Sequence, residues 1–355
     1  MLLASVTAAD ARENRADLIG DALRSAVAWS DLMLIVDTGI NEQMVETARE
    51  IAGDKLHIVK WEGPKDCGNF FEIRNFGLDE AYRLGVDWAC ILDTDERMHT
   101  NGVDVKTELE RIGSGTVLVP IDSRKYLKER FFKIPAKDRY IGGVHECVVP
   151  KDAKQIPLNS ICFSEIPKTP EQQESKLNHM VDMLSKETDK DPDNPRWWYY
   201  LGDSLAGLGR DSEALKAFDH CAAMRGWDEE SAWACFRMAL LLEKMGRRRD
   251  AIDICAAGLT RHAGISELAW FAGEMSLRLG QADKAIYWAR IAVANGTNYG
   301  ESHFIRPRIG FQYPFGAKDG PYDLMARAYA ELGMESEEAK CLAICATLRG
   351  NHDSD

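Results

Sequence analysis

Three acidic residues follow a short apolar run, and their side chains are the ones in this chain most suited to chemistry. The run at residues 88–92 is followed by Asp93-Thr94-Asp95-Glu96. It is short and flanked by polar residues, which predicts a buried strand of a parallel sheet. Open α/β sheets bind ligands beyond the carboxyl ends of their strands. Clustered carboxylates repel one another unless a cation or a hydrogen-bond donor offsets them. A divalent metal held together with a substrate diphosphate is the predicted explanation. A solvated acidic turn is the alternative.

The elements that would position these carboxylates alternate between apolar strands and helical segments over residues 1–165. Gly53 and Gly85 each follow a segment of helical spacing, as expected at a helix end. The alternation predicts a doubly wound α/β sheet with nucleotide chemistry at its strand ends. The predicted strands are 2–7, 32–36, 56–61, 88–92, 117–121, 130–134 and 140–149, and the predicted helices are 16–29, 42–52 and 71–84.

A proline-bracketed polar segment at residues 166–195 predicts a linker and helix, and residues 196–355 change to helical repeats. The segment beginning Trp198-x-x-Leu201-Gly202 resembles the tetratricopeptide (TPR) pattern. The spacing of a turn glycine and a following alanine recurs, which predicts a TPR-like solenoid. The recurring pairs are Gly209 and Ala214, Gly246 and Ala251, Gly280 and Ala285, and more loosely Gly333 and Ala339.

Length and composition limit the function classes. A chain of 355 residues can form two domains, and no stretch approaches a membrane span. The net charge of −13 argues against broad nucleic-acid binding. The scattered nine cysteines predict reduced thiols in a cytoplasmic protein. The first residues predict a strand rather than a signal peptide.

A loop between the third and fourth repeats, residues 295–321, is unusually rich in aromatic and basic side chains. Arg306, Arg308 and Tyr313 could stack on a sugar ring and pair with phosphate or carboxylate, which predicts an acceptor-side loop. The alternative is a loop that packs into the groove of the repeats through its aromatic side chains.

The first half resembles a family-two glycosyltransferase of the GT-A fold, most closely the subgroup with C-terminal TPR repeats. The resemblance rests on five segments taken in this order, and it covers nearly the whole chain together with the repeats. The segments are Ile35-Val36-Asp37-Thr38-Gly39, Asn69-Phe70-Phe71-Glu72-Ile73-Arg74-Asn75, Trp88-Ala89-Cys90-Ile91-Leu92-Asp93-Thr94-Asp95-Glu96, Arg130-Phe131-Phe132-Lys133 and Tyr140-Ile141-Gly142-Gly143-Val144-His145-Glu146.

This resemblance implies a UDP-sugar donor and a GT-A-like nucleotide-sugar-binding domain. Asp37 would accept a hydrogen bond from uracil, Arg74 would lie by the base or diphosphate, and Asp93 would contact the ribose. Arg74 could instead pair with a nearby carboxylate such as Asp79. The full set of implied donor-binding residues is Thr7, Asp37, Arg74, Asp93 and Thr94.

The resemblance also implies a metal ion and a catalytic pair. Mn²⁺ or Mg²⁺ would be held by Asp93, Asp95 and His145, in the manner of a DxD motif. Glu146 would be the general base beside His145, with Asp138 in reserve. The metal would stabilise charge on the departing diphosphate while the base takes the acceptor proton in an inverting hexosyl transfer.

Two other functions stay open. The chain departs from the family pattern at Asn69 and at Ile40-Asn41-Glu42, which would suit a catalytically inactive nucleotide-binding TPR adaptor. A nucleotidyltransferase also uses paired carboxylates, but no glycine-rich loop follows the first strand. The acceptor could be a peptide or protein in the TPR groove, a glycan or a small molecule, and the repeats could instead serve to form a homodimer.

Overall fold

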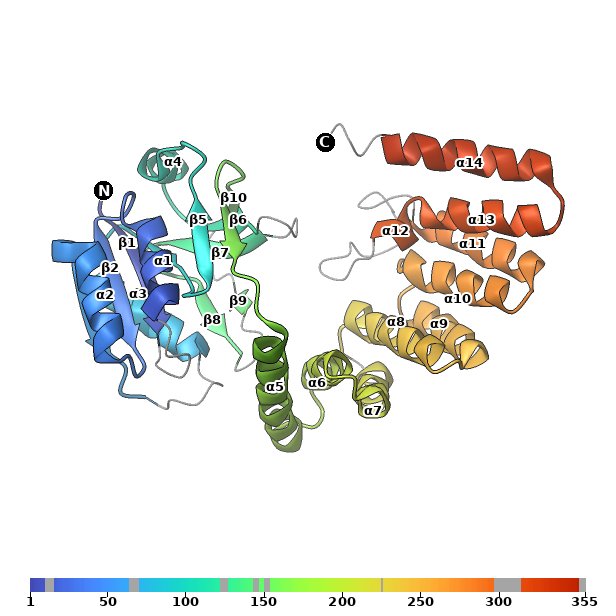
Figure 1. Cartoon of the computed structure of the whole chain (residues 1–355), viewed down its shortest axis with the longest axis horizontal. Coiled ribbons are helices and arrows are strands. Elements are labelled where there is room, and N and C mark those ends of the chain that lie inside the picture. The colour runs from blue at the N-terminus through green and yellow to red at the C-terminus, as the bar shows by residue number, and fades with distance from the viewer. Residues whose placement is uncertain are drawn as a thin grey trace. The chain divides into compact units, whose positions relative to one another are not determined.

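The computed structural model describes residues 1–9, 16–63, 70–121, 127–142, 147–149, 154–224, 226–296 and 314–350. The chain divides into two compact units, Met1–Thr169 and Pro170–Asp355, and each is considered by itself (Figure 1). Five residues predicted to act in chemistry lie outside the described residues, so the structure does not place them. They are His145, Glu146, Arg306, Arg308 and Tyr313.

The first unit is an α/β domain in which the three predicted helices and most predicted strands begin and end close to the predicted positions, and it also contains elements that the sequence did not predict. Asn41 caps α2 by accepting from the Met44 N–H at 2.9 Å, and Gly53 ends it with φ of 52°. The helices are α1 (Ala16–Ala26), α2 (Glu42–Ala52), α3 (Phe70–Arg83) and α4 (Val105–Ile112), with a 3₁₀ turn η2 (Gly53–Lys55). The strands are β1 (Leu3–Ala9), β2 (Leu32–Asp37), β3 (Leu56–Lys60), β4 (Trp88–Ile91), β5 (Glu96–His99), β6 (Thr116–Pro120), β7 (Leu127–Lys133), β8 (Arg139–Ile141), β9 (Cys147–Val149), β10 (Gln155–Pro157) and β11 (Cys162–Glu165).

Seven strands form a mixed sheet in the order β10-β6-β7-β4-β1-β2-β3. β1, β2, β3 and β4 run parallel, whereas β7 is antiparallel to both β4 and β6. The parallel arrangement predicted around strand 88–92 is therefore confirmed for β1 to β4. The sequence did not reveal that β7 runs against it, because a buried apolar run looks the same in either direction. The expected single strand at 140–149 is wrong, since β8 pairs antiparallel with β9.

Side chains at alternate positions of the central strands point to opposite faces of the sheet, and each face has its own hydrophobic core. Leu3, Met33 and Trp88 pack with α1, α2 and α4 on one face. On the other face the neighbouring strand residues pack with α3. At Gly77 of α3, an added Cβ would lie 2.6 Å from the Val6 side chain, so this glycine lets α3 approach the parallel strands. This approach sets the position of Arg74 on the same helix.

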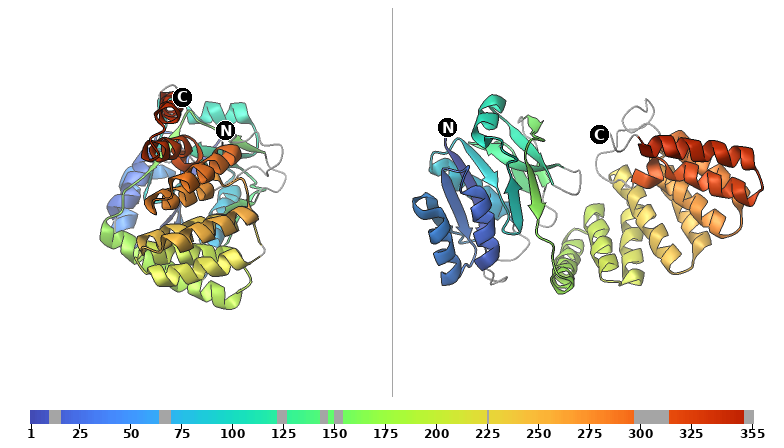
Figure 2. Two further views of the ribbon diagram at one scale, coloured as in Figure 1. Left: turned by 90° about the vertical axis from the view of Figure 1, so that its right-hand side faces the viewer. Right: turned by 45° about the horizontal axis from the view of Figure 1, so that its top comes forward.

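The second unit is a solenoid of antiparallel helix pairs (Figure 2). Its helices are α5 (Pro170–Lys190), α6 (Pro195–Gly207), α7 (Asp211–Ala223), α8 (Asp228–Lys244), α9 (Arg248–Arg261), α10 (Ser266–Arg278), α11 (Ala282–Gly296), α12 (Pro314–Ala317), α13 (Gly320–Glu331) and α14 (Glu335–Gly350). The pairs are α6 with α7, α8 with α9, α10 with α11, and α13 with α14.

The four predicted turn glycines adopt the same conformation between the two helices of each pair. Gly209, Gly246, Gly280 and Gly333 have φ of 73°, 77°, 72° and 70°. This left-handed conformation is one that glycine adopts without strain, so the spacing of these glycines predicted the turns correctly.

Candidate ligand site at the carboxyl ends of the parallel strands

Two of the predicted ligand-binding carboxylates lie at the same edge of the sheet. Asp37 ends β2 and pairs in register with Ala9 of β1. On the other side of β1, Ile91 of β4 pairs with Val6, so Asp93 follows two residues beyond that pair. Neighbouring strands lie about 4.8 Å apart, so the two carboxylates are roughly 10 Å apart across β1. An elongated ligand could span them.

The turn after β2 holds Asp37 in one orientation. Its Oδ1 accepts from the backbone N–H groups of Gly39 at 2.7 Å and Ile40 at 2.8 Å. This is an Asx turn, in which a short carboxylate replaces a backbone acceptor. Gly39 has φ of 133°, and a Cβ added there would meet nothing within 4 Å. The space beside the Gly39 Cα is therefore open among the described residues.

Arg74 of α3 pairs with Asp93, and Asp79 pairs with Arg139. The Arg74 Nη2 donates to both Asp93 oxygens, at 2.8 and 2.9 Å, and the guanidinium lies 5.2 Å from the Tyr140 ring centroid. Asp79 instead accepts from Arg139 at 2.6 Å. Arg74 thus does pair with a nearby carboxylate, as the alternative interpretation expected, and that carboxylate is Asp93. Its guanidinium faces the strand-end carboxylate that the sequence placed in the ligand site.

Asn75 fixes the helix that carries Arg74. Its side-chain oxygen accepts from the Tyr140 N–H at 3.0 Å, and its amide nitrogen donates to the Tyr140 carbonyl at 2.9 Å. These two hydrogen bonds resemble the backbone pairing between strands, and they connect α3 to β8. Arg74 therefore contacts the Asp93 carboxylate, while the adjacent Asn75 holds α3 against β8.

Glu96 belongs to the buried frame of the site and not to its open edge. Its side chain is 1% exposed and pairs with Arg130 of β7, which is 3% exposed. Lys128 lies 3.4 Å from the same carboxylate and pairs with Glu165 at 2.7 Å. The second Glu96 oxygen accepts from the Asp93 N–H at 3.2 Å. This carboxylate therefore braces the turn that carries Asp93.

Asp95 points to another basic residue. Its carboxylate pairs with Lys168, while its backbone carbonyl accepts from the Ile166 N–H at 2.8 Å. Thr94 is partly exposed, and its carbonyl accepts from Arg97 at 2.8 Å. The turn from Asp93 to Glu96 is thus held at every residue by a hydrogen bond or an ion pair.

Protein cations supply the charge compensation that the acidic motif needs. Arg74 offsets Asp93, Lys168 offsets Asp95, and Arg130 with Lys128 offsets Glu96. The clustering of these carboxylates therefore does not by itself require a metal, since side chains of the protein already supply cations and hydrogen-bond donors. Among the described residues no three His, Cys, Asp or Glu side chains form a metal-binding group, and His145 lies outside them. A Mn²⁺ or Mg²⁺ ion at Asp93 and Asp95 stays a prediction.

The two acidic ends of the turn are shifted in opposite directions. Burial raises the pKa of Asp93, but the Arg74 and Arg130 guanidinium groups outweigh it and bring the pKa down to about 2. Burial, and next the charge of Asp93, raise the pKa of Glu96 above its ordinary value, although Arg130 and Lys128 oppose this. The pKa is thus lowered at Asp93, whose side chain is the more exposed of the two, and raised at the buried Glu96.

Two other predicted site residues are enclosed. β1 continues to Ala9, so the expectation that Thr7 ends the first strand is wrong, and its side chain is fully buried. Asp138 is 1% exposed and accepts from the Thr116 hydroxyl at 2.6 Å. Asp138 serves as a buried acceptor between β6 and the segment before β8. This does not suit a base that must reach an acceptor.

The sequence did not indicate the roles of Lys128, Arg130 and Lys168 in this site. One feature of the sequence could have indicated the first two of these roles. Lys128 and Arg130 lie inside the strand 127–133, close to two fully buried phenylalanines. A charge at an inward position of a strand requires a partner, and Glu96 was the candidate. Lys168 carried no such signal, because it follows β11 by three residues and meets Asp95 only through folding.

The low pKa of Asp93 predicts a stability change in acid. A carboxylate whose folded-state pKa lies below its ordinary 3.8 stabilises the fold above that value, and this contribution is lost as pH falls towards about 2. We expect Asp93→Asn to be about 1–2 kcal/mol less stable than wild type near neutral pH, with the gap closing at about pH 2. Urea unfolding across this range measures it. Asp79→Asn, which removes an exposed pair, is the control, and a gap that stays constant into acid would contradict the expectation.

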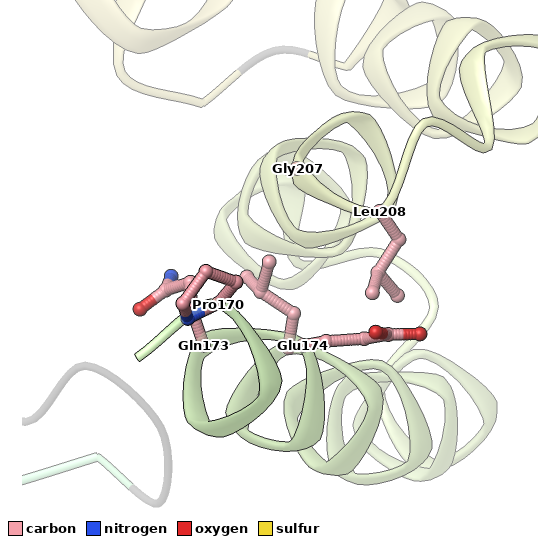
Figure 3. A pocket seen from close by; sticks show the side chains of 6 residues that line it. Pro170, Gln173, Glu174, Gly207 and Leu208 are labelled. Atoms are coloured by element: carbon pink, nitrogen blue, oxygen red, sulfur yellow. The ribbon is translucent and has the colours of Figure 1, made fainter. Parts of the chain in front are cut away.

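The solenoid has a hollow of its own, of about 460 Å³, between α5 and α6. Figure 3 shows Pro170 and Glu174 of α5 near Gly207, the last residue of α6, and Leu208, which follows it. A Cβ at Gly207 would lie 2.9 Å from Leu177, so the glycine brings the two helices together. The lining holds a single carboxylate and no cation, and none of the predicted site residues lies in it.

Comparison with known proteins supports the repeats. The tetratricopeptide repeat family matches residues 182–222 and 236–299. The TPR-like solenoid predicted for the second half is thereby confirmed, and the first half is an α/β region with a mixed sheet. No curated protein sequence matches the chain. The glycosyltransferase resemblance and its GT-A assignment stay predictions.

Several solved TPR structures resemble the chain weakly. A crystal structure of MamA has 14% identity and a TM-score of 0.41, covering 54% of this chain and 100% of its own. MamA from Desulfovibrio magneticus RS-1 has 16% identity and a TM-score of 0.38, covering 51% and 88%. YrrB, described as a TPR protein with an unusual peptide-binding site, has 13% identity and a TM-score of 0.37, covering 50% and 80%. No helix among the described residues is long and apolar enough to cross a membrane.

Proposed function

We propose that the chain is a nucleotide-binding TPR adaptor: its α/β unit binds a nucleoside diphosphate or its sugar ester, and its solenoid holds a peptide or protein partner. The observation that carries the nucleotide half is the placement of Asp37 and Asp93 at one edge of the sheet, with Arg74 beside Asp93. The family match to the repeats supports the partner half, because helical repeats commonly present extended binding surfaces.

The edge offers complementary groups for the two ends of such a ligand. Asp37 has a second carboxylate oxygen besides the one bound by its turn, and it could accept from a base N–H. Arg74 is 16% exposed and Lys168 is 28% exposed, so their cationic groups can reach a ligand. A guanidinium and an ammonium are the usual partners of a diphosphate. The ligand would thus lie across β1, with its base by β2 and its phosphates by β4.

Calorimetric titration of the full chain with UDP, in the presence of Mn²⁺ and then of EDTA, tests the proposal. We expect saturable binding of one UDP per chain. Loss of binding in EDTA would assign a metal to the acidic turn, while equal binding would assign the diphosphate to the basic side chains alone. An absence of binding in both conditions would refute the nucleotide half.

Transfer of a sugar from a UDP-sugar is the second candidate function. It is favoured by the position of Asp93, Thr94 and Asp95 at the ligand edge, where an acidic turn can hold a metal–diphosphate leaving group. The catalytic base would be Glu146, because Asp138 is buried against Thr116. The product would carry the sugar on a peptide, glycan or small-molecule acceptor.

Mass spectrometry of mixtures of protein, UDP-sugars and candidate acceptors separates the enzyme from the adaptor. If sugar transfer occurs, Glu146→Gln should slow it by roughly 10²–10⁴-fold, as expected for loss of a general base. Asp95→Asn should slow it through the diphosphate, and exposed Glu62→Gln is the control. Wild-type rates in both site variants would exclude this mechanism, and UDP binding without any product would leave the adaptor.

A further inference from the structure

Helix α10 of the third repeat is buried on all of its sides, since residues 266–277 are all buried. Glu267, Trp270 and Glu274 follow the spacing i, i+3 and i+7, so they share one side of the helix. The other sides pack on α9, on α8, and on α11 with α13, through Leu268, Phe271 and Gly273 respectively. We call the side with Glu267, Trp270 and Glu274 the inner face of α10.

The corresponding side of the first repeat is open. Counted back from the turn glycine of each pair, Glu267 and Glu274 correspond to Arg196 and Asp203 of α6. The side chains of Arg196 and Asp203 are 34% and 43% exposed. By contrast, the Glu274 side chain is 9% exposed and Glu267 is 0% exposed. Arg327 of α13 pairs with Glu274, so the cover over the other end of the inner face comes from elsewhere.

The short helix α12 lies on this end of the inner face (Figure 1). The Phe315 ring meets the Trp270 ring edge to face, with centroids 5.6 Å apart. A Cβ added at Gly316 would lie 2.7 Å from the Trp270 ring and 3.1 Å from the Glu267 side chain. The absence of a side chain at Gly316 therefore allows the close approach. An aromatic residue followed by glycine is the sequence that fits against this face.

The contact of α12 with the inner face is small. α12 is a single turn, Pro314–Ala317, and a helix of this length is not stable by itself. Phe315 is still 37% exposed while it contacts Trp270. The inner side is open again at α8, where Leu240, the residue that corresponds to Glu274, is 39% exposed. A longer peptide that continues from α10 along α8 and α6 can therefore make contacts that α12 does not make.

We propose that α12 is an occupant of the inner face of α10 that the chain itself supplies, and that a partner peptide with an aromatic residue followed by glycine binds there by displacing α12. The proposal rests on the partner half of the proposed function and names the class of peptide and its regulation. When the face is occupied by α12, the apparent affinity for the peptide is reduced to the fraction of molecules in which the face is free. Weakening the contact of α12 should therefore strengthen peptide binding.

Fluorescence anisotropy of a labelled peptide with the sequence of residues 311–318, titrated with the full chain, tests the displacement. We expect Phe315→Ala to bind this peptide at least about 10-fold more tightly than wild type, because the substitution frees a face that is mostly occupied. Tyr287→Ala, at a 64% exposed aromatic residue of α11, is the matched control and should bind as wild type does. A peptide carrying Gly316→Val should bind neither chain. Circular dichroism should show an unchanged fold in both variants of the chain.

A photo-crosslink locates the bound peptide. Benzoylphenylalanine at the Phe315 position of the peptide should crosslink to residues 266–278 of the Phe315→Ala chain, as mapped by mass spectrometry. Equal affinities of the wild-type and Phe315→Ala chains, no binding to Phe315→Ala, or crosslinks confined to other helices would overturn the proposal. Titration of Phe315→Ala with UDP, which should match wild type, tests the nucleotide half of the proposed function separately.

Discussion

Replacing Arg130 with leucine should cost the α/β unit about 3–5 kcal/mol of unfolding free energy. The substitution leaves Glu96 buried at 1% exposure with Lys128 as its remaining cation, at 3.4 Å. An uncompensated buried charge is among the largest single sources of instability. Hydrogen exchange at the amides of β4 reports the loss in the unit where it occurs, since the chain holds two units with separate cores.

A double variant shows whether the loss comes from the charge or from packing. Arg130→Leu combined with Glu96→Leu removes both charges, so it should be more stable than Arg130→Leu alone. Arg111→Leu removes an exposed pair with Glu108 at 2.7 Å and should change stability by less than about 1 kcal/mol. If Arg130→Leu cost no more than Arg111→Leu, the buried frame described for the acidic turn would be incorrect.

Arg74→Ala should weaken UDP binding by roughly 10–100-fold, the value of one or two hydrogen bonds to a charged group. The variant removes the cation closest to the proposed diphosphate and leaves Asp93 to repel it. Arg83→Ala is the matched control. Arg83 lies on the same helix and pairs with Glu80, but it is 69% exposed. It should bind UDP as the wild type does.

The two arginine variants also distinguish UDP binding at the strand-end site from attraction of UDP by the overall charge of the protein. If Arg74→Ala and Arg83→Ala weakened binding equally, the protein would attract UDP through its overall electrostatics. If neither changed the affinity, the ligand would lie elsewhere and the strand-end site would be excluded.

Much of the fold follows from local patterns. Gly53 ends α2, Asn41 starts it, and the four turn glycines mark the repeats, because each needs a particular backbone conformation or capping group. The short strands β5, β10 and β11 carry too few residues to show a pattern. The direction of β7 could not be predicted either. A strand buried on both faces lacks the alternation of apolar and polar residues that is typical of an antiparallel strand.

The candidate site was predictable only in part. Asp37, Arg74 and Asp93 were named from the sequence, and the structure brings Arg74 and Asp93 into contact. The sequence misplaced Thr7, because the length of β1 cannot be read from an apolar run that continues into alanines. It could not reveal that Lys168 meets Asp95 across 73 positions of the chain. A cation that is distant in the sequence can neutralise an acidic motif and so change its chemistry. The residues around the motif do not show that such a partner exists.

The central claim is that a nucleoside diphosphate binds across the carboxyl ends of β2 and β4. Hydrogen exchange of the full chain with and without saturating UDP tests it most directly. We expect UDP-dependent protection at residues 37–40 and 92–96, with the repeats from residue 196 onwards unchanged. Protection confined to the repeats, or protection of neither strand end while UDP is bound, would show that the nucleotide does not bind across these strand ends.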